Sequence, residues 1–285
     1  MSVKVEEDLK IELEKNGGWD PRVRSIKCGD LVRSYLIKTE RFLLIYDTLL
    51  GPKSGAFLRE QALQFADGRP LLVVNSHADW DHYFGNMMFP EPILGSQLMI
   101  DRLREGVGDK ELQKKRAAHP LHYQDVALLF PSVGLSGPTT LQGGDLTLEI
   151  LVTPGHRPDH LALYIPEINT LFPGDCVEDP IPLVDEDSTE ASQTLRELTE
   201  SLESMLALKA QWVLANHASP EPGSSQLEAN LQYLKRLAKD SREARDLEDL
   251  QSRSPIDPRW DSFYQSAHLS QLRMAWEQSS CSLRT

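Results

Sequence analysis

Several features that would assign this chain to a particular class are missing from it. Its 285 residues include only three cysteines, at positions 28, 176 and 281, and no Cys-x-x-Cys pair. We therefore expect reduced thiols, with neither a disulfide framework nor a thiolate zinc site. No apolar run reaches the roughly 18 residues of a membrane span, and the N-terminus lacks the apolar core of a signal peptide. The expectation is a cytoplasmic protein without a membrane partner.

Positive charge is also scarce. The chain carries 30 basic and 43 acidic residues, which gives a formal net charge of −13. Proteins that bind the phosphate backbone of nucleic acids need clustered lysine and arginine, so nucleic acid is not an expected partner. A hydrophobic content of 40% is enough for the core of one large domain or two small ones. A Gly-x-Ser-x-Gly motif is absent, so nothing indicates a serine nucleophile.

Residues 71–82 combine an apolar run with a cluster of imidazoles and carboxylates. The run Leu71–Val74 follows a proline and is typical of a short buried strand. Imidazole and carboxylate are the groups that bind Zn, Mn or Fe in proteins. The alternative is an acidic surface loop with stray histidines. Four potential ligands follow the run within six residues: His77, Asp79, Asp81 and His82.

Three later apolar runs end in the same way, with a glycine or another small residue close to a potential ligand. These ligands are His156 after Thr-Pro-Gly, Asp175 after Phe-Pro-Gly, and His217 after Ala-Asn. A glycine at such a position lets the backbone turn tightly and approach an ion. Each of the three alone is more typical of a structural residue. Together with residues 77–82 they predict a metal centre.

This set of residues resembles the five motifs of the metallo-β-lactamase fold superfamily, over roughly residues 25–220. The resemblance implies an α/β fold, a four-layer αββα sandwich with two divalent metal ions at the sheet ends. Zinc is the first expectation for these ions, with iron or manganese as alternatives. The implied ligands are His77, Asp79 and His156 for the first ion, Asp81, His82 and His217 for the second, and Asp175 as the bridge, with Asp81 also as the catalytic residue.

The chain departs from the commonest family pattern at position 79, where Asp replaces His and gives an HxDxDH variant of the motif. Two interpretations of Asp79 remain open. It is a metal ligand, or it caps a short helix that begins near Asp81, where a carboxylate is favoured by the helix dipole.

The function that the resemblance implies is hydrolysis by a hydroxide that bridges the two ions, because such ions generate this nucleophile near neutral pH. The expected substrate is a small ester, thioester, lactone or phosphoester. Two alternatives remain. One is an iron-dependent redox enzyme of flavodiiron or dioxygenase type, and the other is a non-catalytic metal-binding member of the fold.

The expected organisation is a polar arm at 1–20, a metallo-β-lactamase-like domain at 21–220, and helices at 221–285 that pack on the same domain. A substrate wall or a contact in a homo-oligomer are alternatives for these helices. Ser225 and Glu228 form the pattern of a capping box, Asp257 before Pro258 predicts the start of a last helix, and the charged stretch 239–254 separates the two.

Residues 97–130 are expected to be helical but interrupted at Gly106, Gly108 and Pro120. Within them, residues 102–116 carry six basic and three acidic side chains. A solvated helix face is the preferred interpretation, and a lid over an anionic substrate is the alternative. Cys176 is expected to be an inert buried thiol, and His160 to hold a ligand or to be purely structural.

Overall fold

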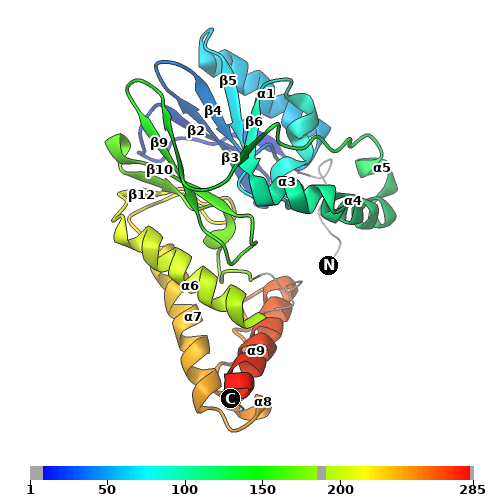
Figure 1. Ribbon diagram of the computed structural model, residues 1–285, viewed down its shortest axis with the longest axis vertical. Coiled ribbons are helices and arrows are strands. Elements are labelled where there is room, and N and C mark those ends of the chain that lie inside the picture. The colour runs from blue at the N-terminus through cyan, green and yellow to red at the C-terminus, as the bar shows by residue number, and fades with distance from the viewer. Residues whose placement is uncertain (1–8, 185–190, 283–285) are drawn as a thin grey trace.

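Two β-sheets packed face to face form the centre of the protein, and helices cover both outer faces (Figure 1). The computed structural model describes residues 9–184 and 191–282. Within these residues the first sheet has seven strands in the order β1 to β7, and the second has six in the order β13-β12-β11-β10-β9-β8. This arrangement confirms the expected four-layer αββα sandwich.

The first sheet changes from antiparallel to parallel pairing at β4. Strands β1 to β4 form an antiparallel meander, and β4 to β7 are parallel neighbours. Strand β1 lies inside the expected polar arm, so part of that arm belongs to the sheet. The strands are β1 (Ile11–Leu13), β2 (Val23–Cys28), β3 (Val32–Lys38), β4 (Leu43–Tyr46), β5 (Leu71–Val74), β6 (Ile93–Ser96) and β7 (Val133–Leu135).

The second sheet is antiparallel except where β11 and β12 run parallel. Apolar side chains of the two sheets interlock between them, for example Tyr35 and Phe172, whose ring centroids lie 5.1 Å apart. The strands are β8 (Thr139–Gln142), β9 (Thr147–Val152), β10 (Leu161–Ile165), β11 (Thr170–Phe172), β12 (Trp212–Val213) and β13 (Glu221–Pro222).

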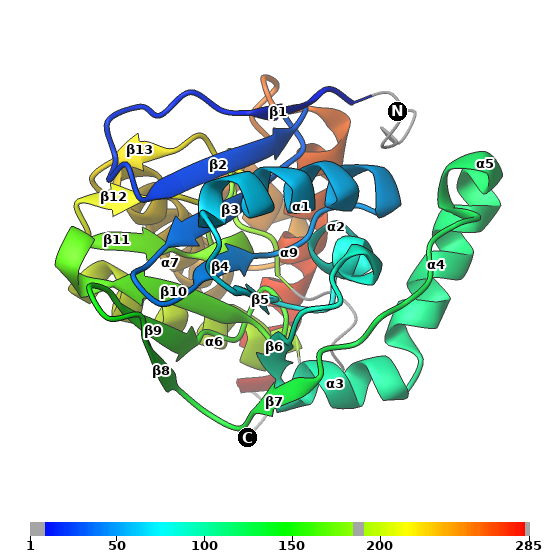
Figure 2. The same ribbon diagram turned by 90° about the horizontal axis from the view of Figure 1, so that it is seen from above.

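Helix α1 (Pro52–Ala66) lies along the outer face of the first sheet, as Figure 2 shows. Its buried residues, among them Leu58 and Ala62, pack on Ile45 and Val73 of the sheet. Burying an aliphatic side chain of this size contributes roughly 1.5–3 kcal/mol. Because α1 connects β4 to β5, its packing also holds the carboxyl ends of these two strands side by side.

The segment 80–123 is mostly helical: α2 (Trp80–Tyr83), the 3-10 helix η2 (Phe84–Met88), α3 (Gln97–Arg104), α4 (Val107–Ala118) and α5 (Pro120–Tyr123). The expected interruptions at Gly106 and Pro120 are present. The one expected at Gly108 is wrong, because this glycine lies inside α4. A Cβ at Gly108 would lie 2.2 Å from the hydroxyl of Tyr83, so close packing explains the glycine.

Helices α6 (Ala191–Ala207), α7 (Ser225–Glu243) and α9 (Ser262–Ser282) pack together on the side of the second sheet and extend beyond it. Helix α8 (Leu247–Arg253) packs on α7 and α9 at the end away from the sheet. Leucines of α6, α7 and α9 pack with Leu171 and Val213 of the sheet in one hydrophobic cluster. Helix α8 lies in the charged stretch expected to be a separator. The leucine spacing of the sequence predicts an amphipathic helix over 188–208, and its first residues, 188–190, lie outside the described residues. No helix among the described residues is long and apolar enough to cross a membrane.

The predicted caps of the C-terminal helices are wrong. Ser225 does not cap α7, because the carboxylate of Glu221 accepts the Gln226 backbone N–H at 2.6 Å instead. Helix α9 begins at Ser262 rather than at Asp257, and Asp261 accepts backbone N–H groups of its first turn at 2.9 and 3.1 Å. In both cases a carboxylate nearer to the real turn satisfies the free N–H groups.

Candidate metal centre

The predicted ligands follow the carboxyl ends of strands in both sheets. Residues 77–82 follow β5 of the first sheet, and the three later ligands follow β9, β11 and β12 of the second. The structure brings together all seven side chains named from the sequence. Their ligand atoms form overlapping groups whose members lie within 4.8 Å of one another: His77, Asp79 and His156; Asp81, His82 and His217; and His77, His82 and Asp175.

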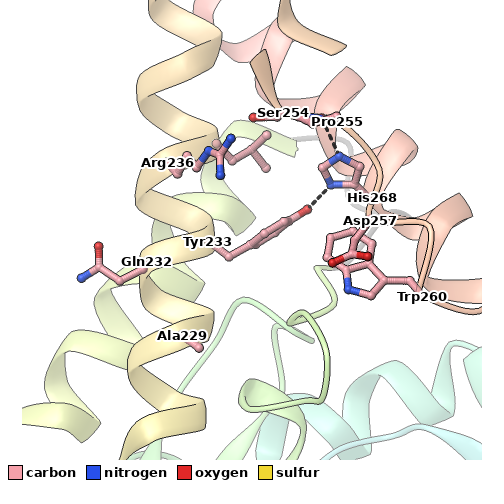
Figure 3. A pocket seen from close by; sticks show the side chains of 10 residues that line it. Ala229, Gln232, Tyr233, Arg236, Ser254, Pro255, Asp257, Trp260 and His268 are labelled. Carbon is pink, nitrogen blue, oxygen red and sulfur yellow. Dashed lines mark hydrogen bonds between the residues drawn. The ribbon is translucent and has the colours of Figure 1, made fainter. Parts of the chain in front are cut away.

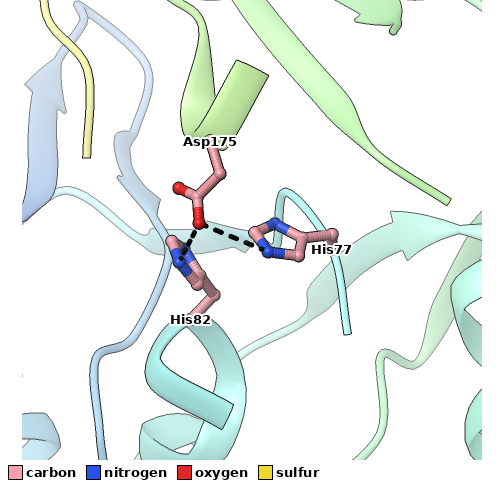
Figure 4. Close-up of side chains that lie close together, drawn as sticks. All are labelled: His77, His82 and Asp175. Carbon is pink, nitrogen blue, oxygen red and sulfur yellow. Dashed lines mark ion pairs between the residues drawn. The ribbon is translucent and has the colours of Figure 1, made fainter. Parts of the chain in front are cut away.

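Asp175 lies at the centre of the cluster, where one oxygen faces four imidazoles. Its Oδ2 lies 3.0 Å from Nε2 of His82 and 3.6 Å from Nε2 of His77, as Figure 4 shows. The same oxygen is 3.2 Å from Nε2 of His217 and 3.6 Å from Nε2 of His156. A carboxylate that reaches both groups of potential ligands has the position expected of a bridge.

The two outer carboxylates each serve one side of the cluster. Asp79 Oδ2 lies 3.6 Å from Nε2 of His77 and 3.5 Å from Nε2 of His156. Asp81 lies 3.7 Å from Nε2 of His82 and 3.3 Å from Nε2 of His217. This division agrees with the two ligand groups that the family resemblance implies.

The donor atoms of the cluster fit a metal ion. Nε2 of His77, Nε2 of His156 and Oδ1 of Asp175 are buried, and none of them has a hydrogen-bond partner among residues 9–184 and 191–282. Leaving a buried polar atom unpaired costs about 1–3 kcal/mol. Four imidazole nitrogens and three carboxylates that converge in this way form a donor set suited to zinc, iron or manganese.

Interleaved imidazoles and carboxylates set the electrostatics of the cluster. Burial disfavours the charged form of Asp175, but His217 and His82 outweigh it and hold the pKa of this carboxyl well below its usual range. Burial likewise disfavours protonated His82, but Asp175 and Asp81 raise the pKa of this imidazole well above its usual range. A metal ion must displace protons from such nitrogens, so its binding is expected to weaken as the pH falls.

Arg157 holds Asp79 in place. Its Nε lies 2.9 Å from both oxygens of the carboxylate. Burial disfavours the charged form of Asp79, but Arg157 and His77 outweigh it and hold the pKa of Asp79 well below its usual range. Asp79 occupies the position before α2, yet its side chain makes no capping hydrogen bond there. The carboxylate therefore faces the cluster and Arg157, and not the free N–H groups of α2.

Asp47, which the sequence analysis missed, lies behind the cluster and contacts two of the loops that carry predicted ligands, the one after β5 and the one after β12. It is fully buried, and its Oδ2 lies 2.9 Å from Nδ1 of His82 and accepts hydrogen bonds from Ser76 Oγ and Asn216 Nδ2. Ser76 Oγ in turn contacts Nδ1 of His77 at 2.8 Å. Protons on both Nδ1 atoms leave both Nε2 atoms free for a ligand role.

His160 supports the loop that carries Asp175. Its Nε2 accepts the backbone N–H of Asp175 at 3.2 Å, so Nδ1 carries the proton and donates to Thr153 Oγ1 at 2.8 Å. Burial, together with His77 and His156, holds the pKa of His160 well below its usual range. Gly174 adopts φ +57, and a Cβ there would lie 2.3 Å from His160 Nε2. The glycine before the ligand thus allows this contact.

Cys176 agrees with the expected inert thiol. It is fully buried, donates to the Thr153 carbonyl at 3.4 Å, and burial raises the pKa of its thiol. Asp159 is a second buried carboxylate that the sequence analysis missed. It accepts the Ala78 backbone N–H at 2.9 Å and forms an ion pair with Arg102. Arg102 therefore anchors the loop of residues 77–79 to α3.

The basic segment 102–116 is divided in its roles. Arg116 of α4 donates to backbone carbonyls of Tyr123 and Val126, so it has a structural role in holding the chain that follows α4. The side chain of Lys114 is 73% exposed. Lys115 differs, because its side chain is only 14% exposed and its Nζ lies 3.4 Å from the ring centroid of Trp80. In the sequence, Trp80 stands between Asp79 and Asp81. Burial lowers the pKa of Lys115, and the negative charge of Asp81 opposes this shift.

Glu178 is a further carboxylate at the edge of the cluster that no sequence pattern indicated. It is 2% exposed, and burial raises its pKa to about 7. Its ligand atom groups with those of His156 and Asp175 within 4.8 Å.

Comparisons with known proteins agree with this geometry. A two-sheet sandwich with His and Asp side chains converging at the strand ends defines a class of metal-binding α/β proteins. The family model described as the metallo-beta-lactamase superfamily matches residues 29–217, more than half of the chain. The chain therefore belongs to the metallo-β-lactamase superfamily, whose members are mostly metal-dependent hydrolases.

Solved structures of low sequence identity share the fold. A metallo-β-lactamase from Pontibacter korlensis is 19% identical with a TM-score of 0.60, over 79% of this chain and 99% of that one. A metallo-β-lactamase family protein from Thermus thermophilus is 18% identical with a TM-score of 0.59, over 95% and 90% of the two chains. A double mutant of the sec-alkyl sulfatase PisA1 is 15% identical with a TM-score of 0.66, over 94% of this chain and 50% of that one.

Proposed function

We propose that this protein is a binuclear metal-dependent hydrolase of a small ester, thioester, lactone or phosphoester. The observation that carries the proposal is the position of Asp175 Oδ2, within 3.0–3.6 Å of Nε2 of four imidazoles. Two divalent ions held by these residues would supply a hydroxide nucleophile near neutral pH and would polarise the attacked oxygen.

The chain's own residues would hold and orient these ions. His77, Asp79 and His156 would bind the first, and Asp81, His82 and His217 the second. Asp175 would bind both. Asp47 supports this arrangement, because its contacts with His82 Nδ1 and Ser76 direct Nε2 of His82 and His77 into the cluster. Imidazoles fixed in one tautomer lose little freedom when they bind a metal ion.

We assign Asp81 as the catalytic residue as well as a ligand. It is 7% exposed, so its carboxylate is shielded from bulk water while it borders the cluster at the second group. A carboxylate beside the nucleophile can orient a water molecule and accept its proton. The substrate would then be attacked by water without a covalent enzyme intermediate.

Iron-dependent redox chemistry is the second candidate, and Asp79 favours it. The position of Asp79 Oδ2 beside His77 and His156 adds a hard oxygen donor to the first group. Carboxylate-rich sites suit iron and manganese better than sites of imidazole alone. Elemental analysis, colour and oxygen consumption separate this candidate from a colourless zinc hydrolase.

Replacing Asp175 tests the binuclear proposal. We expect wild-type protein to bind two ions per chain and to hydrolyse at least one member of a panel of esters, thioesters, lactones and phosphoesters. Asp175→Ala should lose both ions and activity together, because one carboxylate contacts both groups. Circular dichroism and the melting temperature of the metal-free protein report whether the fold survives.

Asp175→Asn is the control for the cavity that alanine leaves, since it keeps the volume and removes the charge. We expect it to reduce metal content as well. Full metal content and full activity in both variants would refute the binuclear site. Metal content without any hydrolysis across the panel would favour a non-catalytic member of the fold.

A further inference from the structure

Glu178 brings a buried and incompletely satisfied carboxylate to the edge of the candidate metal centre. Its Oε1 is buried, has no hydrogen-bond partner in the described part of the chain and lies 3.7 Å from Nδ1 of His156. An unpaired buried carboxylate oxygen is costly, so a specific arrangement must hold it there.

The C-terminal helices supply that arrangement. Tyr264 of α9 donates its hydroxyl to Oε2 of Glu178 at 3.1 Å. Asn230 of α7 holds the backbone from both sides, since its Oδ1 accepts the Glu178 N–H at 2.8 Å and its Nδ2 donates to the Glu178 carbonyl at 2.9 Å. Gln226 donates to the same carbonyl at 2.7 Å. All of these partners follow residue 217, where the family match ends.

Oε1 of Glu178 lies on the Nδ1 side of the predicted ligand His156, away from the cluster. Nε2 of His156 faces Asp79 and Asp175, so a role in metal binding requires the proton on Nδ1. That Nδ1 lies 3.2 Å from the Leu183 carbonyl and 3.7 Å from the Glu178 carboxylate. The Leu183 carbonyl accepts the Nδ1–H and fixes the tautomer, and a carboxylate close behind a metal-binding imidazole increases its basicity. The same segment also reaches His217, with which Glu178 forms an isolated β-bridge.

We propose that Glu178 is a positioning residue for His156, and that Tyr264 makes the C-terminal helices part of the metal centre by holding Glu178. This inference rests on the proposed function, because it requires a cation at His156. It assigns the region beyond residue 217 a role in metal binding in addition to packing.

A second tyrosine in the same helices, Tyr233, provides a matched control. It lines a cavity of about 340 Å³ (Figure 3). There Tyr233 of α7 donates its hydroxyl to Nδ1 of His268 at 2.9 Å, and Nε2 of His268 donates to the Ser254 carbonyl at 2.9 Å. Tyr233→Phe and Tyr264→Phe thus delete the same atom and one hydrogen bond each. They differ in that only the Tyr264 hydroxyl contacts Glu178.

The experiment compares metal affinity, by competition with a chromogenic chelator, and metal content, by elemental analysis. In Glu178→Gln, Tyr264 can donate to the remaining oxygen, which leaves the amide N–H₂ opposite the N–H of His156. We expect this variant to bind one of its two ions about 10- to 100-fold more weakly. Tyr264→Phe should lower the affinity for the same ion by up to about tenfold, and Tyr233→Phe should leave the affinities for both ions unchanged.

A double variant shows whether Tyr264 acts through Glu178. Glu178→Gln with Tyr264→Phe should bind metal no more weakly than Glu178→Gln alone, because residues that act as one unit are not additive. Undiminished affinity in Glu178→Gln, or equal losses in the two tyrosine variants, would overturn the inference while the wild type still binds two ions. A wild type that binds no metal would instead contradict the proposed function on which the inference rests.

Discussion

Replacing Asp79 by asparagine separates the two interpretations of this residue that the sequence left open. A side chain that caps a helix typically contributes about 1 kcal/mol of stability through its bond to a backbone N–H. Asp79 makes no such bond to α2, and its Oδ2 lies instead 3.5–3.6 Å from Nε2 of His156 and His77. The structure therefore predicts that Asp79→Asn acts on metal affinity and leaves the capping of α2 unchanged.

The magnitudes follow from the two contacts that Asp79 makes. Its ion pair with Arg157 is partly exposed, with 21% and 25% of the two side chains accessible, so its loss should lower the free energy of unfolding by only about 1 kcal/mol. A neutral amide oxygen in place of a charged ligand should lower the affinity for the first ion at least tenfold, which corresponds to about 1.4 kcal/mol of binding free energy. The effect on metal affinity should thus exceed the effect on the metal-free fold.

The assay is a chelator competition on metal-replete protein, with elemental analysis and a melting curve of the metal-free form. Asp67→Asn is the control, because Asp67 is an exposed carboxylate at the end of α1 in a left-handed conformation that asparagine tolerates. Two ions bound by Asp79→Asn with wild-type affinity would refute the ligand assignment. A large drop in its melting temperature with unchanged metal content would make Asp79 a structural residue.

Two other substitutions test the surroundings of the cluster. Asp47→Asn replaces one oxygen of a fully buried acceptor by a donor, so we expect the free energy of unfolding in urea to fall by roughly 2–4 kcal/mol and metal affinity to fall about 10- to 100-fold. Wild-type values for both would show that Asp47 does not orient the imidazoles. Lys115→Gln should raise KM for an anionic substrate more than it lowers kcat, whereas Lys114→Gln, on an exposed side chain, should change neither. Equal KM values at low salt would assign Lys115 to packing on Trp80 alone.

The side chains of the candidate metal centre were predictable from the sequence because each follows a short apolar run. A strand that ends in a tight turn places the next polar side chain at the sheet edge, and several such strands meet at one edge. Asp47 follows the strand Leu43–Tyr46 in the same way, so the pattern itself could have identified it. Its function lay beyond the pattern, since it binds Ser76, His82 and Asn216 and contributes to the cluster only through them.

Other contributors could not be found from local sequence. Asp159 accepts the N–H of Ala78, 81 residues earlier, and Tyr264 donates to Glu178, 86 residues earlier. These contacts exist only after the sheets and helices have packed. The capping errors have a related cause, because Ser225 and Asp257 carried the local pattern while Glu221 and Asp261 were better placed by the incoming chain.

The departure at position 79 is compensated within the same site. An aspartate in place of the usual histidine adds one negative charge, and Arg157 returns one positive charge through contacts of 2.9 Å to both carboxylate oxygens. Arg157 directly follows His156, so one loop supplies a proposed ligand and the counter-charge for another. With two divalent ions bound as proposed, the net charge of the seven side chains, the ions and Arg157 then equals the net charge of a centre that has histidine at position 79. The pair Asp79–Arg157 therefore changes the type of donor atom from nitrogen to oxygen while largely preserving the local charge, and its effect should fall on the choice of metal more than on the acidity of a bound water.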